Sequence, residues 1–386
     1  MKTQNRQYRF LIVASILLAV CSPLCCQNYS NGLKNDSHIA TEMRLKKLLE
    51  SPTCLNGYFP GQRGPLSKMD AKENLVIDST FTVEKMEIES EGFSICGWLY
   101  IPKKAGKLSL IILANGGSGK GLSEWLAPIF AHCGFAAFVH DKRATGESEG
   151  DLSKATYDNY VTDIGNIAKF LSLRKQINPD KIGVLGGSEG GRIAYLAAAR
   201  FPLIKFAASY AGDITSTFDS RYYATTGWLK LQNLSDSVLN EILQLWKKSF
   251  DAWISDKPEE HKKINIEILE FRKRFDKDIL PYPKEEMDTI SALRGLLPTW
   301  NSMKNDYLSE LKKFNKKWLT VFGAEDIVVP TDICVKNITN YMNQSGNKDY
   351  EIIILPKCGH APVNSETREM VRIDHIFVNW LKENGF

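Results

Sequence analysis

Histidine and cysteine are scarce in this sequence, and their spacing excludes common metal sites. Of the 386 residues, six are histidine and eight are cysteine, and no two cysteines form a CxxC pair. We therefore expect no zinc site and no metal cofactor. Five cysteines follow residue 26, and an odd number cannot all pair within one chain. The chain is not a disulfide scaffold, although an oxidising compartment would allow one or two bridges.

A strong excess of charge of one sign is missing as well. The formal net charge is +4, with 24% charged and 43% hydrophobic residues. Nucleic-acid-binding surfaces carry a marked basic excess, so we expect no nucleic-acid partner. No strong electrostatic field would steer an acidic substrate towards this protein. The composition indicates a globular chain with enough apolar residues for a large core.

The apolar stretch near the N-terminus, residues 10–20, is too short to span a membrane. Its eleven residues are about half of the roughly 20 that a transmembrane helix needs. Basic residues precede it, and small or helix-breaking residues follow at 21–26. This order is typical of a secretory signal peptide, residues 1–26, with cleavage before Gln27. We expect export, to the periplasm or outside the cell, and no membrane span in the mature chain.

Attachment of a lipid to a cysteine of this segment is an alternative that stays open. Cys21, Cys25 and Cys26 are the candidates, but neither Val20 nor Leu24 is the small residue usually found before such a cysteine. Removal of the signal peptide takes away three basic residues and no acidic one, which leaves a formal net charge of +1.

From residue 80 onwards, strand and helix patterns alternate along the chain. Residues 80–102 predict two antiparallel strands, and 108–114 is an apolar run typical of a strand buried on both faces. Further strands are expected at 135–140, 182–185, 206–210, 319–322 and 350–355. Helices are expected at 122–133, 157–173, 189–200, 331–342 and 366–382. The predicted fold class is α/β, a mostly parallel central sheet with helices on both faces.

Two segments stand outside this alternation. Residues 213–315 are too long for a loop, and apolar residues recur in them at helical intervals. We expect a helical cap, or lid, over the carboxyl ends of the strands, where such sheets bind ligands. The core is then formed by 80–212 together with 316–386. Residues 27–79 form an N-terminal extension whose one signal is a helix around 40–49.

A nucleophile motif lies between a predicted strand and a predicted helix. Residues 186–190 read Gly-Gly-Ser-Glu-Gly and fit the pattern G-x-S-x-G. The pattern alone is weak, but a strand before it and a helix after it are the context of a nucleophile elbow. Such a turn exposes the hydroxyl of Ser188 and directs the backbone N–H of Glu189 at a developing oxyanion.

A serine nucleophile needs a histidine base and an acid, in the chain order Ser, acid, His. His360 directly follows the last predicted strand, whereas the other histidines precede the serine or lie in the cap or a helix. Asp326 follows the preceding strand, and its rival Glu325 should point the opposite way. We therefore predict Ser188, Asp326 and His360 as a catalytic triad, in which Asp326 orients the imidazole.

The second oxyanion donor is expected in the glycine-rich loop after the strand at 108–114. Residues 115–119 read Asn-Gly-Gly-Ser-Gly, and glycines let backbone N–H groups approach a substrate closely. The backbone N–H that donates could be that of Gly116, Gly117 or Ser118. The motif of a phosphate-binding loop is incomplete, because it requires serine or threonine after its lysine, and glycine follows Lys120 here.

Several segments together resemble one superfamily. Residues 187–191, Gly-Ser-Glu-Gly-Gly, are similar to a GHSEGG elbow, and 141–148, Asp-Lys-Arg-Ala-Thr-Gly-Glu-Ser, to a D-x-R-G-x-G-x-S segment. The residues that end in Asp326 and His360 resemble the G-x-x-D and G-x-H motifs. Residues 80–386 thus resemble the α/β-hydrolase superfamily, and within it exported serine esterases related to the prolyl-oligopeptidase and serine-aminopeptidase groups.

The resemblance implies the same three roles, with Ser188 as nucleophile, Asp326 as acid and His360 as base. Two positions depart from the pattern. Gly187 stands where the elbow usually has histidine, and Asn115 stands where the oxyanion loop usually has histidine. The second departure leaves the choice among the oxyanion donors open.

The function that the resemblance implies is hydrolysis of a small-molecule carboxylic ester by a carboxylesterase-like serine hydrolase. The acyl chain is expected to be short, and neither a metal nor an organic cofactor is needed. A serine peptidase or an acyltransferase or thioesterase with the same triad is the alternative. A third hypothesis is a non-catalytic binding protein with this fold, but the intact triad argues against it. The oligomeric state stays open.

Overall fold

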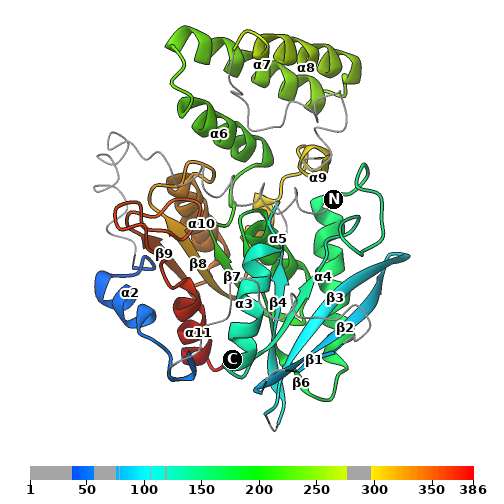
Figure 1. The fold of residues 1–386 in the computed structure, drawn as a ribbon, viewed down its shortest axis with the longest axis vertical. Helices are drawn as coiled ribbons and strands as arrows, with labels where there is room; N and C mark the ends of the chain where they lie inside the picture. Colours follow the sequence, from blue (N-terminus) through cyan, green and yellow to red (C-terminus); the bar gives the residue numbers. More distant parts are fainter. Residues whose placement is uncertain (1–36, 56–74, 78, 105, 118–119, 276–296) are drawn as a thin grey trace, which may run out of the picture.

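The computed structural model describes most of the chain. The described residues are 37–55, 75–77, 79–104, 106–117, 120–275 and 297–386 (Figure 1). The predicted signal peptide and part of the predicted extension lie outside these ranges. No helix within them is both long and apolar enough to cross a membrane.

A nine-stranded sheet forms the centre of the described structure. Its strands are β1 (Leu75–Ile77), β2 (Phe81–Ser90), β3 (Phe93–Pro102), β4 (Leu108–Ala114), β5 (Ala136–His140), β6 (Ile177–Gly187), β7 (Ile204–Tyr210), β8 (Lys317–Gly323) and β9 (Tyr350–Leu355). The spatial order is β1-β2-β3-β5-β4-β6-β7-β8-β9. The first four strands in this order pair antiparallel, and those from β5 to β9 run parallel. The predicted α/β fold with a mostly parallel sheet is confirmed.

Both faces of the sheet are buried, because successive side chains of a strand point to opposite sides. In β4, Leu110 and Ile112 belong to one apolar core, and Ile111 and Leu113 belong to the other. A strand that is apolar on both faces needs helices on both sides of the sheet. This explains the continuous apolar run in the sequence of β4.

Helices cover the two faces (Figure 1). One core contains side chains of α4 (Tyr157–Ser172), α5 (Glu189–Arg200) and α10 (Thr331–Ser345). The other contains side chains of α2 (Glu42–Leu49), α3 (Gly121–His132) and α11 (Ile373–Glu383). The predicted helices that correspond to α3, α4, α5 and α10 are confirmed, each end lying within three residues of its expected position.

The last helix starts later than its apolar pattern predicts. We expected a helix over 366–382, but α11 begins at Ile373. The side chain of Asn364 accepts hydrogen bonds from the backbone N–H groups two and three residues later, at 2.9 and 3.0 Å, and Arg368 has a φ of +63°. Such local bonds offer the backbone an alternative to a helix. The prediction was therefore wrong for 366–372.

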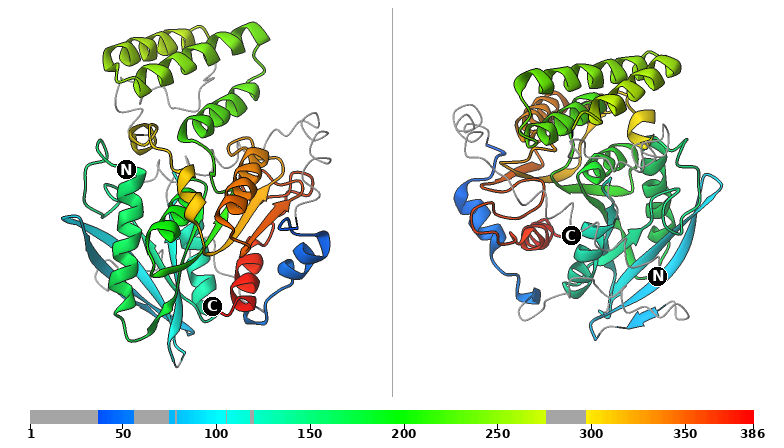
Figure 2. Two further views of the ribbon diagram at one scale, coloured as in Figure 1. Left: turned by 180° about the vertical axis from the view of Figure 1, so that it is seen from behind. Right: turned by 45° about the horizontal axis from the view of Figure 1, so that its top comes forward.

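Among the described residues, four α-helices lie between β7 and β8, inside the segment expected to form a cap. They are α6 (Thr217–Lys230), α7 (Asp236–Ile254), α8 (Pro258–Arg272) and α9 (Leu297–Asn301). Figures 1 and 2 show α6, α7 and α8 beyond the end of the sheet at which β7 ends. These helices have an apolar core of their own, in which the centres of the Phe250 and Trp300 rings lie 4.9 Å apart.

The N-terminal segment contacts both edges of the sheet. β1 pairs with β2 at one edge, and Ile39 forms a parallel bridge to Ile352 of β9 at the other. Next to this bridge, Arg44 of α2 donates to Glu351 and Glu383, each at 2.6 Å. The described parts of the extension, 37–55 and 75–77, are thus paired with the sheet.

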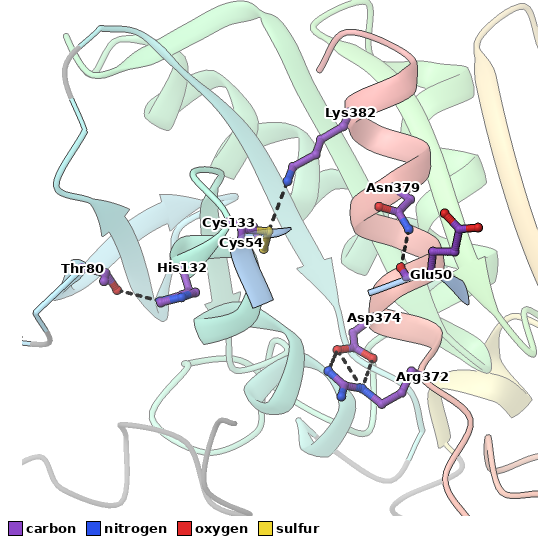
Figure 3. Close-up of a disulfide and its surroundings, with 9 residues drawn as sticks. All are labelled: Glu50, Cys54, Thr80, His132, Cys133, Arg372, Asp374, Asn379 and Lys382. Carbon is purple, nitrogen blue, oxygen red and sulfur yellow. Dashed lines mark hydrogen bonds and ion pairs between the residues drawn. A yellow bond between two sulfur atoms is a disulfide. The ribbon is translucent and has the colours of Figure 1, made fainter. Parts of the chain in front are cut away.

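A disulfide joins this segment to the main body of the protein. Cys54 is bonded to Cys133, directly after α3, with Cα atoms 5.2 Å apart (Figure 3). Nζ of Lys382 in α11 also donates to the sulfur of Cys54 at 3.2 Å. The remaining cysteines of the described ranges are free and buried, namely Cys96, Cys334 and Cys358.

Replacement of both Cys54 and Cys133 by serine is expected to lower the free energy of unfolding by about 4 kcal/mol. The reason is that the bond closes a loop of 79 residues and so restricts the unfolded chain. Urea unfolding followed by tryptophan fluorescence measures the change, and the wild-type protein under reducing conditions should match the variant. An unchanged free energy of unfolding would contradict this structural role.

Candidate functional site

Ser188 lies in a sharp turn between β6 and α5. β6 ends at Gly187, α5 begins at Glu189, and Ser188 between them has a φ of +55°. Non-glycine residues rarely adopt this conformation, because it is strained. A Cβ on Gly190 would lie 2.2 Å from the carbonyl oxygen of Ala114, so only glycine allows the close approach of helix and strand. The predicted strand–turn–helix context of the G-x-S-x-G motif is confirmed.

Backbone hydrogen bonds hold this turn in place. The N–H of Ser188 donates to the carbonyl oxygen of Tyr210, the last residue of β7, at 3.0 Å. The carbonyl oxygen of Ser188 accepts from the N–H groups of Gly191 at 2.9 Å and Asp213 at 3.2 Å. These bonds to the neighbouring strand and the loop after it offset the strain at Ser188.

His360 is hydrogen-bonded to Asp326, which the sequence favoured over Glu325. Nδ1 of His360 lies 2.9 Å from Oδ2 of Asp326, whose side chain is fully buried. Oδ1 of Asp326 accepts from two backbone N–H groups of its own loop at 2.8 and 2.9 Å, which fixes the carboxylate. Glu325 instead approaches Lys357, at 3.9 Å. A histidine whose Nδ1 binds a carboxylate exchanges protons at Nε2.

Two opposing effects set the pKa of His360. Burial lowers the pKa, but the charge of Asp326, its hydrogen bond to Nδ1 and the charge of Asp213 outweigh burial. The pKa of His360 is therefore raised above its ordinary value of 6.5. The raised pKa means that this environment stabilises an imidazolium.

The glycine-rich loop after β4 lies against the elbow. A Cβ on Gly116 would be 3.1 Å from the carbonyl oxygen of Gly187 and 3.6 Å from Cβ of Ser188. A Cβ on Gly117 would be 3.9 Å from Oε2 of Glu189. Gly116 therefore lies beside the serine and Gly117 lies near the side chain of Glu189, so the loop is close to the turn, as a second oxyanion donor would require. The third predicted alternative, residue 118, lies outside the described residues.

Lys142 joins this loop to the elbow, which the reasoning from motifs missed. Its Nζ donates to the carbonyl oxygen of Gly116 at 2.9 Å and to Oε1 of Glu189 at 2.8 Å. The sequence signal for Lys142 was its place inside the segment 141–148. That segment resembles a family motif, but the motif alone predicted no role for the lysine.

The segment 141–148 is a turn closed by its own side chains. The carboxylate of Asp141 accepts a backbone N–H from the far side of the turn at 2.9 Å, and the hydroxyl of Ser148 donates to the carbonyl oxygen of Asp141 at 2.9 Å. Gly146 has a φ of +58°, and a Cβ there would overlap the Asp141 carboxylate. The aspartate, glycine and serine of the motif thus hold the turn that presents Lys142.

A buried ion pair links the elbow helix to the cap, and sequence reasoning missed it as well. Arg192 of α5 pairs with Asp213 at 2.6 Å, and their side chains are 1% and 8% exposed. The same guanidinium donates to Thr217, the first residue of α6, at 2.9 Å. Neither residue belongs to a motif, so the pair follows only from the fold.

The first cap helix also contacts the loop that carries Asp326. A Cβ on Gly227 of α6 would lie 2.2 Å from the carbonyl oxygen of Ile327. The hydroxyl of Tyr223 donates to the carbonyl oxygen of Asp326 at 3.0 Å. The base of the cap is therefore packed directly on the acid loop.

The predicted site segments thus follow strands of the parallel part of the sheet, at its carboxyl edge. The glycine-rich loop follows β4, Ser188 follows β6, Asp326 follows β8 and His360 follows β9. Parallel sheets bind ligands at this edge. In the part of the chain that the structure describes, no group of three or more His, Cys, Asp or Glu side chains could hold a metal ion.

Replacement of Asp326 by asparagine is expected to lower the pKa of His360, because the charge that stabilises the imidazolium is lost. NMR titration of the imidazole Cε1–H signals measures the change. His261 in the cap is the internal control, since burial lowers its pKa and it should titrate below 6.5 in both proteins. An unchanged pKa of His360 would contradict its coupling to Asp326.

The chain is similar to bacterial proteins over part of its length. It is 31% identical over 120 residues to the protein of Escherichia coli called "Uncharacterized 31.7 kDa protein in traX-finO intergenic region". That match covers 30% of this chain and 41% of the relative. The chain spans less than half the length of the curated relatives that it matches.

Solved structures share the fold. The crystal structure of the hypothetical protein PA2218 from Pseudomonas aeruginosa has a TM-score of 0.50 at 18% identity, and the match covers 82% of this chain and 97% of that chain. The alpha/beta hydrolase GrgF from Penicillium sp. sh18 also has a TM-score of 0.50, at 15% identity, with 78% and 98% covered. At such identities the likeness shows the fold alone.

A family match covers the region of the site. Residues 165–362 match the family described as "BAAT / Acyl-CoA thioester hydrolase C terminal". This range is slightly more than half of the 386 residues, and it contains Ser188, Asp326 and His360. The chain belongs to the BAAT / acyl-CoA thioester hydrolase C-terminal family and, through it, to the α/β-hydrolase superfamily.

Proposed function

We propose that this protein is a serine hydrolase that cleaves carboxylic esters, with Ser188, Asp326 and His360 as its catalytic triad. The observation that carries the proposal is the strained turn at Ser188, on the same edge of the sheet as the His360–Asp326 pair. Strain of this kind persists where the surrounding structure enforces it, and such positions cluster at active sites. The order Ser, Asp, His along the chain is that of α/β hydrolases.

The acylation step uses each of these groups once. Oγ of Ser188 attacks the carbonyl carbon of the ester while Nε2 of His360 takes the hydroxyl proton. Asp326 stabilises the imidazolium that forms, in line with the raised pKa of His360. His360 then gives this proton to the leaving alcohol, and the acyl group remains bonded to Ser188.

Hydrolysis of the acyl-enzyme follows the same route with water as the nucleophile. His360 takes a proton from the water, which attacks the acyl carbonyl, and then returns it to Oγ of Ser188 as the carboxylic acid leaves. In both steps the negative oxygen of the tetrahedral intermediate accepts hydrogen bonds from backbone N–H groups, for which Glu189, Gly116 and Gly117 are the candidates.

The substrate that we propose is a small-molecule ester with a short acyl chain. The cap, residues 213–315, would act as a lid and supply part of the substrate pocket. Packing of α6 on the Asp326 loop supports this, because it brings the cap to the edge of the site. Export is part of the proposal, and the Cys54–Cys133 disulfide supports it, since disulfides persist in oxidising compartments.

Thioester hydrolysis is a second candidate, because the family description names acyl-CoA thioester hydrolases. The same triad serves both reactions, since an acyl-enzyme forms whether oxygen or sulfur leaves. A comparison of p-nitrophenyl butyrate with butyryl-CoA separates the two. A higher kcat/KM for butyryl-CoA would favour the thioesterase, and a higher value for the oxygen ester would favour the esterase.

Ser188→Ala is expected to lower kcat on p-nitrophenyl esters, from acetate to dodecanoate, by at least about 10⁴-fold, because the acyl-enzyme cannot form. Turnover by the wild-type protein should fall as the acyl chain lengthens. Ser172→Ala, at the end of α4, is the matched control and should keep the wild-type rate. Wild-type activity in Ser188→Ala would refute the proposed nucleophile. Absence of ester turnover in the wild-type protein would favour a peptidase or an acyltransferase.

A further inference from the structure

Lys142 connects the two segments that would supply the oxyanion donors of the proposed hydrolase. Its Nζ is bonded to the carbonyl oxygen of Gly116, after β4, and to the carboxylate of Glu189, at the start of α5. One ammonium group therefore bridges segments that are far apart in the sequence. The side chains of Lys142 and Glu189 are only 10% and 13% exposed, so solvent screens their interaction less than at a surface.

The turn that carries Lys142 is itself held on two sides. The next residue, Arg143, donates to the carboxylate of Asp163 in α4 from Nε at 3.1 Å and from Nη2 at 2.5 Å, and both side chains are buried. Nζ of Lys142 also lies 5.2 Å from the centre of the Tyr160 ring. A lysine restricted in this way can orient the groups that it contacts.

The hydrogen bond from Lys142 to the carbonyl oxygen of Gly116 restrains one peptide group of the glycine-rich loop. In a trans peptide the C=O and the following N–H point in opposite directions. With the carbonyl of Gly116 held by Lys142, the N–H of Gly117 is directed away from the ammonium group. Neither glycine has a side chain that would otherwise limit rotation of this peptide. The peptide lies next to the nucleophile, because a Cβ on Gly116 would be 3.6 Å from Cβ of Ser188.

We propose that Lys142 is a positioning residue of the oxyanion site. It holds the peptide between Gly116 and Gly117 so that the N–H groups of Gly117 and Glu189 converge on the substrate oxyanion. The inference rests on the proposed function and identifies Gly117 as the second donor. Lys142 acts through these backbone groups and exchanges no proton. An unrestrained loop would still admit the ester but would stabilise its transition state less.

Lys142→Met tests this role, because methionine keeps an apolar stem and removes the three N–H donors. Titration with a fluorophosphonate counts the active sites, so that kcat refers only to folded enzyme. We expect kcat per titrated site on p-nitrophenyl butyrate to fall by about 10- to 100-fold, with KM changed by less than about twofold. The Ki of a trifluoromethyl ketone, whose adduct with Ser188 carries an oxyanion, should rise by a similar factor.

Two further variants separate this role from other effects of losing a charge. Lys85→Met is the control, because it removes a 2.6 Å ion pair to Glu147 of the same turn and should keep the wild-type kcat per site. Lys142→Met/Glu189→Gln leaves no unpaired carboxylate beside the oxyanion site. If Lys142 acts through the Gly116 carbonyl, this double variant should remain as slow as Lys142→Met.

A wild-type kcat per site in Lys142→Met, or recovery of kcat in the double variant, would overturn the role of Lys142. A rise in KM without a fall in kcat would also overturn it, because the loss would then concern substrate binding. Wild-type activity in Ser188→Ala would instead contradict the proposed function itself. The two failures are therefore distinguishable in the same set of assays.

Discussion

The close approach of α5 to β4 and β6 is the constraint on which the rest of the site depends. A Cβ on Gly186 would lie 2.2 Å from the carbonyl oxygen of Gly190, and a Cβ on Gly190 would lie 2.2 Å from that of Ala114. Glycine at both positions lets the helix begin this close to the strands, and the turn then forces Ser188 to a φ of +55°. A non-glycine residue in so sparsely populated a backbone region costs on the order of 1–3 kcal/mol, which bonds to β7 and the loop after it offset. Backbone packing therefore determines where the serine lies.

Hydrogen bonds connect the other site segments to this turn and to one another. Lys142 bonds to the loop after β4, and the hydroxyl of Tyr210 donates to the carbonyl oxygen of Gly359, next to His360, at 3.0 Å. Tyr223 of the cap donates to the backbone of Asp326. A site held by such contacts changes little during a reaction, which is the condition for strong electrostatic stabilisation of a transition state. The cap is part of this arrangement, so movements of α6 would reach the Asp326 loop.

Local patterns in the sequence were enough for every strand of the sheet except β1, and for most helices and the elbow. Strand and helix periods and the G-x-S-x-G motif are properties of neighbouring residues. The pairing of His360 with Asp326 followed from the order of strands. The sequence did not predict contacts between segments that are far apart in the chain. These contacts include the Cys54–Cys133 disulfide and the hydrogen bonds of Lys142. The start of α11 was missed because side-chain hydrogen bonds from Asn364 compete with the helix.

Mapping of a fluorophosphonate adduct by peptide mass spectrometry identifies the nucleophile, because the reagent reacts only with an activated nucleophile. If Ser188 is the nucleophile, we expect one adduct, on the peptide that contains Ser188, and none on that peptide in Ser188→Ala. An adduct on a different residue, or an unlabelled protein that still hydrolyses esters, would contradict the assignment of Ser188 as the nucleophile.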